Sequence, residues 1–477
     1  MSLFRVLQLM LYSLCLASPA DAEVTPIRWQ EASALTPLEQ LGLQIFYDSN
    51  LSSPAGQACA SCHDPKVSFS DSTNTAAVSS GAVAGRQGSR NTPSIAYALF
   101  SPTFSWDKTT NTYSGGQFLD GRAATANAQA KGPFLNPLEM NNASAAAVVA
   151  KLRNAEYAGL FTTVFGANAL ADNDTAFDLM TDALVAFEKT ALFSRFSSKY
   201  DYYLAGKVQL TALEKHGMEV FNDENKGNCA ACHPSTANGS TPPLFTDFTY
   251  DNLGVPANTS MFALNSPAFI DLGLGVTVAD QAQNGKFKVP TLRNIAKTAP
   301  YMHNGVFQTL EEVIDFYNTR DVNRQWAPAE VSANKNVDEL GNLNLSAQQT
   351  AALAAFLRTL SDGYVQQLPG YSALTQILEL PRVQIDNPPY ANAVISAKLQ
   401  NVSRGDKVYF RVLSWQNTAE SILPEDSAAL PYYSTVTQCL EIPMLRVYNQ
   451  GDYIVQLKRV MAAEGLLFEL VYSKPLA

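Results

Sequence analysis

Apolar and polar residues follow the period of an amphipathic helix over residues 343–362, and two shorter helical patterns begin at Thr36 and Thr211. Both shorter patterns open with Thr-x-Leu-Glu, in which the Thr is a typical N-cap and the Glu falls in the first turn. A Gly and then a Phe follow each Thr at the same offsets. This repetition predicts one helical unit that occurs twice, in domains at residues 23–205 and 206–365.

After about residue 365 the helical period ends, and short runs rich in Val, Ile, Leu, Tyr and Phe are separated by Gly, Pro, Asn and Asp. Such runs predict strands, so residues 366–477 are expected to form an all-β domain. The runs span residues 377–385, 391–402, 407–417, 437–449, 452–461 and 466–474. They contain no catalytic motif, which favours a packing or docking role. Cys439 is expected to be a buried core thiol.

The composition is that of a globular chain, since 46% of the 477 residues are hydrophobic and 16% are charged. These proportions exclude a disordered, collagen-like or coiled-coil protein. The 33 basic residues are outnumbered by 43 acidic ones, the net charge is −10, and the basic residues form no cluster. Nucleic-acid binding is therefore not expected.

Residues 1–22 have the features of a secretory signal peptide. Arg5 is the only charge before a short apolar run, and Ala20-Asp21-Ala22 is a small-x-small cleavage site. A membrane span is the alternative, but the run is shorter than the ~20 apolar residues that crossing requires. We therefore expect export to the periplasm or the cell surface, and no membrane span.

Two Cys-x-x-Cys-His motifs carry the main candidate chemistry. In each, two thiols about one helical turn apart can form thioethers to the vinyl groups of a haem, and the adjacent His can bind the iron. The alternatives are a disulfide, a redox-active pair or a zinc site, but zinc needs more ligands and only His216 and His303 remain. Two such motifs in an exported chain favour two covalently bound c-type haems. Their protein ligands would be Cys59, Cys62 and His63 for the first haem and Cys229, Cys232 and His233 for the second.

The internal repeat also indicates what faces each iron opposite its His. Counted from the corresponding glycines Gly121 and Gly305, Pro133 and Tyr317 fall at the same offset. Proline cannot bind iron, whereas a tyrosine phenol can. The iron of the first haem is thus expected to have an open position opposite its His. Tyr317 is either an iron ligand of the second haem or a helix residue that fills the core.

Gln129 and Glu139 flank Pro133 and are candidates for peroxide chemistry at an open haem. A carboxylate can take a proton from one peroxide oxygen and return it to the other, with the amide as a hydrogen-bonding partner. The alternative is a solvated Glu in a loop rich in Gly and Pro.

Residues 31–362 resemble the bacterial di-haem cytochrome c peroxidases and their relative MauG, which oxidises another protein. The matching segments are CASCHDP (59–65), SRNTP (89–93), FLDGRA (118–123), QAKGPFLNPLEM (129–140), CAACH (229–233), VPTLRNIAKTAPYMHNG (289–305) and TLEEVIDFYN (309–318). The resemblance implies a mainly α fold in which two c-type cytochrome domains, related by duplication, face each other. The C-terminal all-β domain lies outside the resemblance.

The resemblance also implies roles for particular residues. Glu139 would be the catalytic acid/base, with Gln129 as its partner, at a peroxidatic haem on His63. Tyr317 would bind the iron of the electron-transfer haem opposite His233. A calcium ion would lie between the domains, held by Asn91 and by the backbone carbonyls of Thr298 and Pro300.

Three departures from the family pattern bear on the mechanism. Residues 64–128 contain no His, so the blocking His of many peroxidases has no counterpart there. Leu119 stands where the family has a Trp between the haems, and residues 226–228 lack the Trp that MauG uses to pass oxidising equivalents outward. The tryptophans of this chain are Trp29, Trp106, Trp326 and Trp415.

Three functions fit these observations. The first is a periplasmic peroxidase that reduces hydrogen peroxide with electrons from a small cytochrome c or a cupredoxin. The second is a MauG-like enzyme that uses peroxide to oxidise Trp or Tyr side chains of a partner protein. The third, a di-haem electron carrier, has no need of Gln129 or Glu139. The residues favour an oxidoreductase, a di-haem peroxidase of the Tyr-ligated, MauG-like branch.

Overall fold

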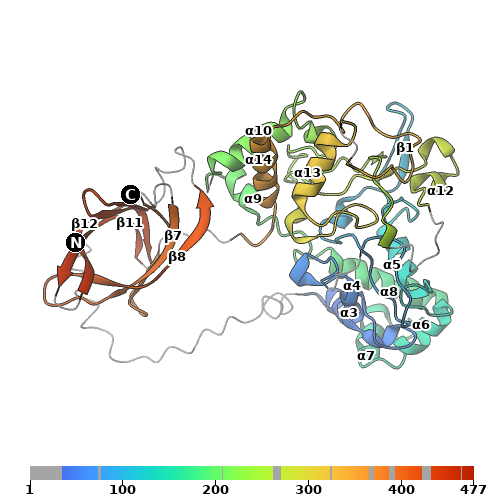
Figure 1. Ribbon diagram of the computed structural model, residues 1–477. Coiled ribbons are helices and arrows are strands. Elements are labelled where there is room, and N and C mark those ends of the chain that lie inside the picture. Colours follow the sequence, from blue (N-terminus) through green and yellow to red (C-terminus); the bar gives the residue numbers. More distant parts are fainter. Residues whose placement is uncertain are drawn as a thin grey trace. The chain divides into compact units, whose positions relative to one another are not determined.

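The computed structural model describes residues 35–72, 77–206, 208–260, 270–322, 325–364, 370–385, 393–421, 431–448, 450–462 and 465–476. The signal peptide predicted at residues 1–22 and Trp29 lie outside this part of the chain. The chain divides into two compact units (Figure 1). The helical unit contains Val24–Val208 and Leu213–Tyr364, and the β unit contains Val365–Ala477.

The first part of the helical unit is built around the long helix α8 (Asn173–Glu188), which buries one apolar face. The helices near it are α3 (Pro37–Tyr47), α5 (Ala126–Leu135), α6 (Ala145–Leu152) and α7 (Ala158–Phe165). Helices α3, α5 and α6 contact α8, and α7 packs on α3 (Figure 1). Helix α3 begins as predicted, because the Thr36 hydroxyl accepts the amide hydrogen of Glu39 and the Glu39 carboxylate accepts that of Thr36.

The second part of the helical unit has helices of 5 to 12 residues joined by long irregular segments. These helices are α9 (Lys199–Leu204), α10 (Ala212–Asn222), α12 (Leu274–Val278), α13 (Leu310–Thr319) and α14 (Ala347–Arg358). Two small antiparallel ladders join β1 (Ser105–Asp107) to β2 (Thr112–Ser114) and β3 (Tyr250–Asp251) to β4 (Phe287–Lys288). Helix α14 confirms the helix predicted over residues 343–362, but it begins only after its cap, Ser346.

Two glycines at corresponding positions let helices cross at backbone contact. A Cβ on Gly42 of α3 would collide with the carbonyl oxygen of Ala183 on α8, and one on Gly217 of α10 would collide with that of Ala352 on α14. Close packing of this kind leaves no room for any larger residue. The glycines of the sequence repeat therefore mark two similar helix crossings.

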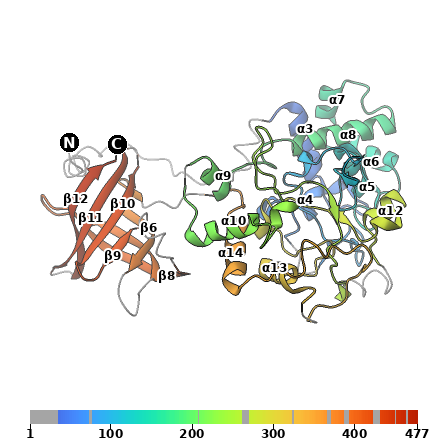
Figure 2. The ribbon, with the colours of Figure 1, turned by 90° about the horizontal axis from the view of Figure 1, so that it is seen from above.

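The β unit is a closed sheet of eight described strands. They are β5 (Gly370–Ser372), β6 (Ile377–Ile385), β7 (Ala393–Asn401), β8 (Tyr409–Ser421), β9 (Tyr432–Ser434), β10 (Cys439–Val447), β11 (Gly451–Ala462) and β12 (Gly465–Pro475). Strands β6, β7, β8, β12, β11 and β10 follow one another around the sheet, and β5 and β9 both pair with β10 and β6 to close it (Figure 2). Buried apolar side chains, such as those of Leu378, Ile442 and Leu457, form its core.

The β unit contains an internal repeat that sequence analysis missed. The segment YSALTQILELP (371–381) recurs as YSTVTQCLEIP (433–443). In both copies the Tyr hydroxyl donates a hydrogen bond to the amide oxygen of the Gln, over 3.0 and 3.1 Å, and that Gln has a φ of +59°. The Pro of each copy falls in a bulge of the long strand. Strands β5–β8 and β9–β12 are therefore two copies of one motif.

The predicted order of a helical region followed by a β region is confirmed. Each of the six predicted strands coincides with a long strand to within a few residues, whereas the three-residue strands β5 and β9 carry no recognisable alternation and were not predicted. Cys439 begins β10 and is only partly buried, so its prediction as a core thiol was wrong. No helix in the described ranges is long and apolar enough to cross a membrane. The duplication of the two cytochrome domains stays a prediction.

Candidate haem sites

A cavity of about 830 Å³ lies within the helical unit and reaches both Cys-x-x-Cys-His motifs. Its lining includes Cys59, Cys62, His63, Cys229, Cys232 and His233. Pockets for small molecules are typically ~300–1,000 Å³, so this cavity is at the large end of that range. The structure therefore brings the two motifs, far apart in sequence, to the walls of one cavity.

The first motif lies on the short helix α4 (Cys59–Cys62), and the amide of His63 donates to the carbonyl of Cys59 over 2.9 Å. Nδ1 of His63 lies 2.9 Å from the carbonyl oxygen of Phe69. Because a carbonyl only accepts, Nδ1 carries the hydrogen and Nε2 keeps the lone pair that a metal needs. Burial lowers the pKa of His63, which favours this neutral ring.

The second motif repeats this geometry in a tighter turn, the 3₁₀ helix η4 (Cys229–Ala231). Nδ1 of His233 lies 2.8 Å from the carbonyl oxygen of Phe245, and burial lowers the pKa of His233 as well. Phe69 and Phe245 both have a positive φ, of 61° and 54°. Each histidine is thus held in one tautomer by the carbonyl of a Phe whose backbone is in the left-handed region. The Nε2 of the histidine stays available as a metal ligand.

The cysteines of both motifs fit covalent haem attachment. All four are free thiols in this structure, and burial raises the pKa of Cys59 and Cys229 to about 12. A pair of partly buried cysteines beside a histidine whose Nε2 is available, on the wall of a large cavity, provides what a c-type haem requires. The residues of both motifs therefore fit the group.

The candidate peroxide-binding residues gather on one wall of the cavity. Helix α5 carries Gln129 and Pro133, Glu139 lies in the turn that follows, and all three line the cavity. Burial raises the pKa of Glu139, although Arg122 and a hydrogen bond from Asn136 lower it in part. A carboxyl group in this position can accept and return a proton during catalysis.

Tyr317 lies on α13 and lines the same cavity beside the second motif. Burial raises the pKa of Tyr317 above its ordinary range, and nearby Cys229 adds to the effect. Pro133 and Tyr317 occupy matching helices, because α5 begins at the cap Thr125 and α13 begins at the cap Thr309. The offset found in the sequence thus corresponds to a similar place in the structure.

Two pairs of polar side chains that line the cavity were not predicted. Arg90 forms two hydrogen bonds with Asp271, over 2.6 and 2.8 Å. Nε2 of His303 lies 2.9 Å from a carboxylate oxygen of Glu330, and the His303 ring stacks on Phe287 at 3.9 Å between centroids. All five residues line the cavity. Asp271 and Glu330 lie in irregular segments far in sequence from their partners, so no local pattern marks them.

Glu188 is a further cavity residue that sequence analysis missed. It ends α8, lines the cavity and lies close enough to Cys59 for its charge to raise the pKa of that thiol. Burial raises the pKa of Glu188 to about 7. The available signal was a carboxyl group one turn after Leu184, on the buried face of an amphipathic helix.

The residues expected to hold calcium are part of the wall of the same cavity. The backbone amide of Asn91 donates to the carbonyl of His303 over 2.8 Å, and the side-chain Nδ2 of Asn91 donates to the carbonyl of Ala77. Asn91, Thr298 and Pro300 all line the cavity. Within the described residues, no cluster of three or more His, Cys, Asp or Glu side chains is arranged for a metal ion. Calcium binding stays a prediction.

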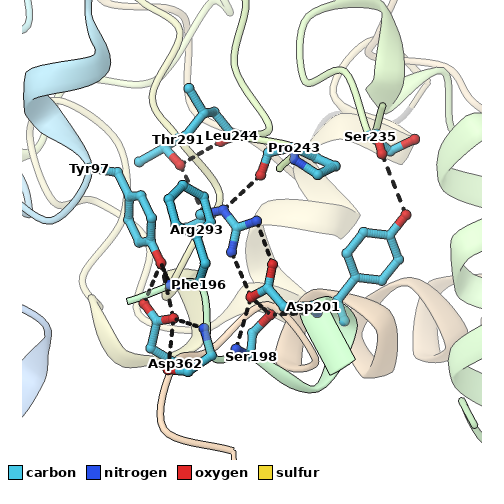
Figure 3. Close-up of polar contacts among 12 residues, drawn as sticks. Tyr97, Phe196, Ser198, Asp201, Ser235, Pro243, Leu244, Thr291, Arg293 and Asp362 are labelled. Carbon is cyan, nitrogen blue, oxygen red and sulfur yellow. Dashed lines mark hydrogen bonds and ion pairs between the residues drawn. The ribbon is translucent and has the colours of Figure 1, made fainter. Parts of the chain in front are cut away.

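A polar network ties together segments around the cavity (Figure 3). The Tyr97 hydroxyl donates to both carboxylate oxygens of Asp362, and Asn294 donates to the same carboxylate. Arg293 pairs with Asp201, and its guanidinium lies 5.1 Å from the Tyr97 ring centre. Tyr97 and Arg293 both line the cavity, so this network fixes part of its wall.

The comparisons with known proteins all indicate the same family. The family model described as di-haem cytochrome c peroxidase matches residues 36–209. The methylamine utilization protein MauG of Paracoccus denitrificans is 42% identical over 346 residues, which cover 68% of this chain and 88% of that protein. The cytochrome c551 peroxidase of Nitrosomonas europaea is 29% identical over 317 residues, 66% of this chain and 82% of that protein.

Two solved structures resemble the chain in fold. The diheme peroxidase BthA of Burkholderia thailandensis has a TM-score of 0.62 and 32% identity, with 70% of this chain and 89% of that chain covered. A MauG-like protein associated with microbial copper homeostasis has a TM-score of 0.54 and 30% identity, covering 74% and 95%. The chain belongs to the di-haem cytochrome c peroxidase family, which includes MauG, and is an oxidoreductase of the peroxidase type. Membership implies two haem groups and hydrogen peroxide as substrate.

Proposed function

We propose that this protein is a periplasmic di-haem peroxidase. Its first motif carries the haem that meets hydrogen peroxide, and its second motif carries a haem that passes electrons and has Tyr317 as its further ligand. The contrast between Pro133 and Tyr317 is the observation that supports this assignment. On matching helices, one half offers the cavity a side chain without a metal-binding atom and the other half offers a phenol.

Glu139 and Gln129 supply the acid–base chemistry in this proposal. When bound, the first haem supplies the iron at which the oxygen–oxygen bond of peroxide is cleaved. Glu139 takes a proton from one peroxide oxygen and returns it to the other as water leaves. Gln129 orients the peroxide or the carboxylate by hydrogen bonding. The Arg122 charge lowers the pKa of Glu139 and so offsets part of the increase that burial causes.

The reductant in this proposal is a small cytochrome c or a cupredoxin. The chain has a net charge of −10, and opposite charges steer protein partners together. A donor with a basic surface would therefore associate quickly at low ionic strength.

A second candidate function is the MauG-like oxidation of Trp or Tyr side chains in a partner protein. The 42% identity to MauG and the presence of Tyr317 favour it. This chain differs from that enzyme at position 119 and at residues 226–228, where it has no tryptophan. The electron-carrier hypothesis finds no support, because the relatives of this chain include peroxidases such as cytochrome c551 peroxidase.

The remaining assignments extend the same proposal. Residues 1–22 direct export, residues 23–205 and 206–365 are duplicated cytochrome domains, and residues 366–477 form the accessory domain. The paired glycine crossings and the paired His–carbonyl bonds support the duplication. Calcium is held by Asn91, Thr298 and Pro300.

Low-temperature EPR of the isolated diferric protein tests the proposal. We expect one high-spin and one low-spin iron signal, and loss of the high-spin signal after one equivalent of hydrogen peroxide. Two low-spin signals that do not respond to peroxide would contradict an open first haem. Mass spectrometry of a candidate partner after peroxide addition then separates the two functions, because only the MauG-like one leaves oxidised side chains in the partner.

A further inference from the structure

Four aromatic rings form a continuous line that starts at the surface of the helical unit. Trp106 on β1 is 38% exposed, and its ring centre lies 4.4 Å from that of Tyr113 on β2. Tyr113 stacks on Phe104 at 5.5 Å, with an angle of 9° between the planes. Phe104 meets Tyr250 edge to face at 6.0 Å. We call these four residues the aromatic line.

The inner end of the aromatic line lies against the wall of the cavity. Tyr250 is only 8% exposed, and a Cβ on Gly121 would collide with its hydroxyl, so the two are in close contact. Asp120, which precedes Gly121, and Asp251, which follows Tyr250, both line the cavity. Tyr250 also pairs with Lys288 across the β3–β4 ladder, and Lys288 is another lining residue. The line thus spans from solvent to the neighbours of residues that line the cavity.

The composition of the line suits one-electron transfer. Indole and phenol are the side chains from which an electron is most easily removed, and three of the four members are Trp or Tyr. The hydroxyl of Tyr250 donates to the carbonyl of Gly115 over 2.6 Å, which fixes the orientation of the phenol. Trp106 combines a readily oxidised ring with exposure, so it is the member that a second protein can reach.

We propose that the aromatic line carries electrons from Trp106 to the cavity, where peroxide cleavage consumes them, and that a one-electron donor protein docks at Trp106. This inference rests on the proposed peroxidase function. For each peroxide, the oxygen–oxygen bond breaks, two protons come from solvent, two electrons move inward one at a time, and two waters form. After each step the donor returns one electron to the oxidised indole.

Without a donor, the line itself is oxidised. Trp106 then takes up one water and releases two electrons and two protons, a net gain of one oxygen atom, which balances the reduction of one peroxide to two waters. The product is a Trp106 peptide that is heavier by one oxygen. Trp415 is a matched internal control because it is 57% exposed but lies on the β unit, outside the line. Direct oxidation by peroxide in solution would affect Trp415 at least as much as Trp106.

The test is peptide mass spectrometry of the haem-loaded protein after one equivalent of hydrogen peroxide, with the high-spin iron signal followed in parallel. We expect an added oxygen on Trp106 and none on Trp415. In Tyr113→Phe, which keeps the stacked ring but removes the phenol, and in Tyr250→Phe, we expect this modification to be lost. Circular dichroism and haem absorbance would establish that both variants fold.

Several outcomes would overturn the inference. Equal oxidation of Trp106 and Trp415, or unchanged Trp106 oxidation in both variants, would exclude transfer along the line. Oxidation of Trp326 in place of Trp106 would assign the route to the rings beside Tyr317, where Trp326 packs on Phe316 at 5.3 Å. Loss of the high-spin signal with Trp106 intact would overturn the aromatic line and leave the proposed function standing. A high-spin signal that persists would overturn both.

Discussion

Arg293 and Asp201 form a doubly hydrogen-bonded ion pair, in which both guanidinium nitrogens lie 2.9 Å from carboxylate oxygens (Figure 3). The Arg293 side chain is 1% exposed, and its Nε also donates to the carbonyl of Pro243. Burial alone would raise the pKa of Asp201, but the hydrogen bonds and charge of Arg293 outweigh burial and lower it. The pair therefore anchors α9 to a segment that lines the cavity.

Asp201→Asn should lower the free energy of unfolding by about 3–5 kcal/mol, because it leaves the Arg293 charge buried without its partner. Denaturant titration followed by circular dichroism measures the change. Asp178→Asn is the control, since the Lys131–Asp178 pair is exposed and such pairs contribute about 0–1 kcal/mol. Equal losses in the two variants would contradict this account.

The same pair predicts a pH dependence of stability. The pKa of Asp201 is lower in the folded protein than in the unfolded chain, so its stabilising contribution is complete above the ordinary value of 3.8. That contribution is lost as pH falls through the folded-state pKa. The difference in unfolding free energy between the unmodified protein and Asp201→Asn should therefore shrink below pH 3.8. A difference that grows on acidification would refute the sign.

Glu139→Gln should slow peroxide cleavage by ~10²-fold or more while both haems stay bound, because a placed acid/base contributes about that much. Stopped-flow absorbance after peroxide mixing gives the rate. In the unmodified protein the rate should fall as pH is lowered through the raised pKa of Glu139, since the proton acceptor is the carboxylate. The rate of the Glu139→Gln variant should not show this fall at low pH. Unchanged turnover would remove Glu139 from the mechanism.

Tyr317→Phe should change the absorbance and EPR spectrum of one haem only, because the phenol is lost as a ligand of the second iron. Tyr301→Phe is the matched control: Tyr301 also lines the cavity, but its hydroxyl donates to the backbone carbonyl of Ile295. We expect that control to leave both spectra intact. Identical spectra for the unmodified protein and Tyr317→Phe would show that Tyr317 does not bind iron.

Gly42→Ala should lower the free energy of unfolding by about 1–3 kcal/mol, because the new methyl group overpacks the crossing of α3 and α8. Gly159→Ala on α7 provides the contrast, since no atom lies within 4 Å of a Cβ at that position. There, alanine loses less backbone freedom on folding than glycine does, so the variant should be more stable by about 0.5–1 kcal/mol. Differential scanning calorimetry of the two variants compares them. The same sign of change in both would argue against close packing at Gly42.

Local chemistry in this chain was readable from sequence, and long-range pairing was not. The Thr36 cap and the two Cys-x-x-Cys-His motifs depend on neighbouring residues, so their spacing predicts them. The Arg90–Asp271 pair joins segments remote in sequence, and no local pattern around either residue indicates its partner.

The repeat within the β unit is visible in the sequence, although it was not predicted. Residues 371–381 and 433–443 share seven identities in a Tyr-Ser-x-x-Thr-Gln-x-Leu-Glu-x-Pro pattern. The way the copies close on each other could not be read from that pattern. It depends on β5 and β9, which are too short to show a period.

Those two short strands exchange partners symmetrically. Strand β5 runs antiparallel to β6 of its own copy and parallel to β10 of the other, while β9 runs antiparallel to β10 and parallel to β6. The contact is therefore self-complementary, as in a twofold dimer fused into one chain. A single copy would expose the unpaired edges that the other copy now covers. Each copy therefore completes the sheet of the other, and neither can be removed without opening the closed sheet.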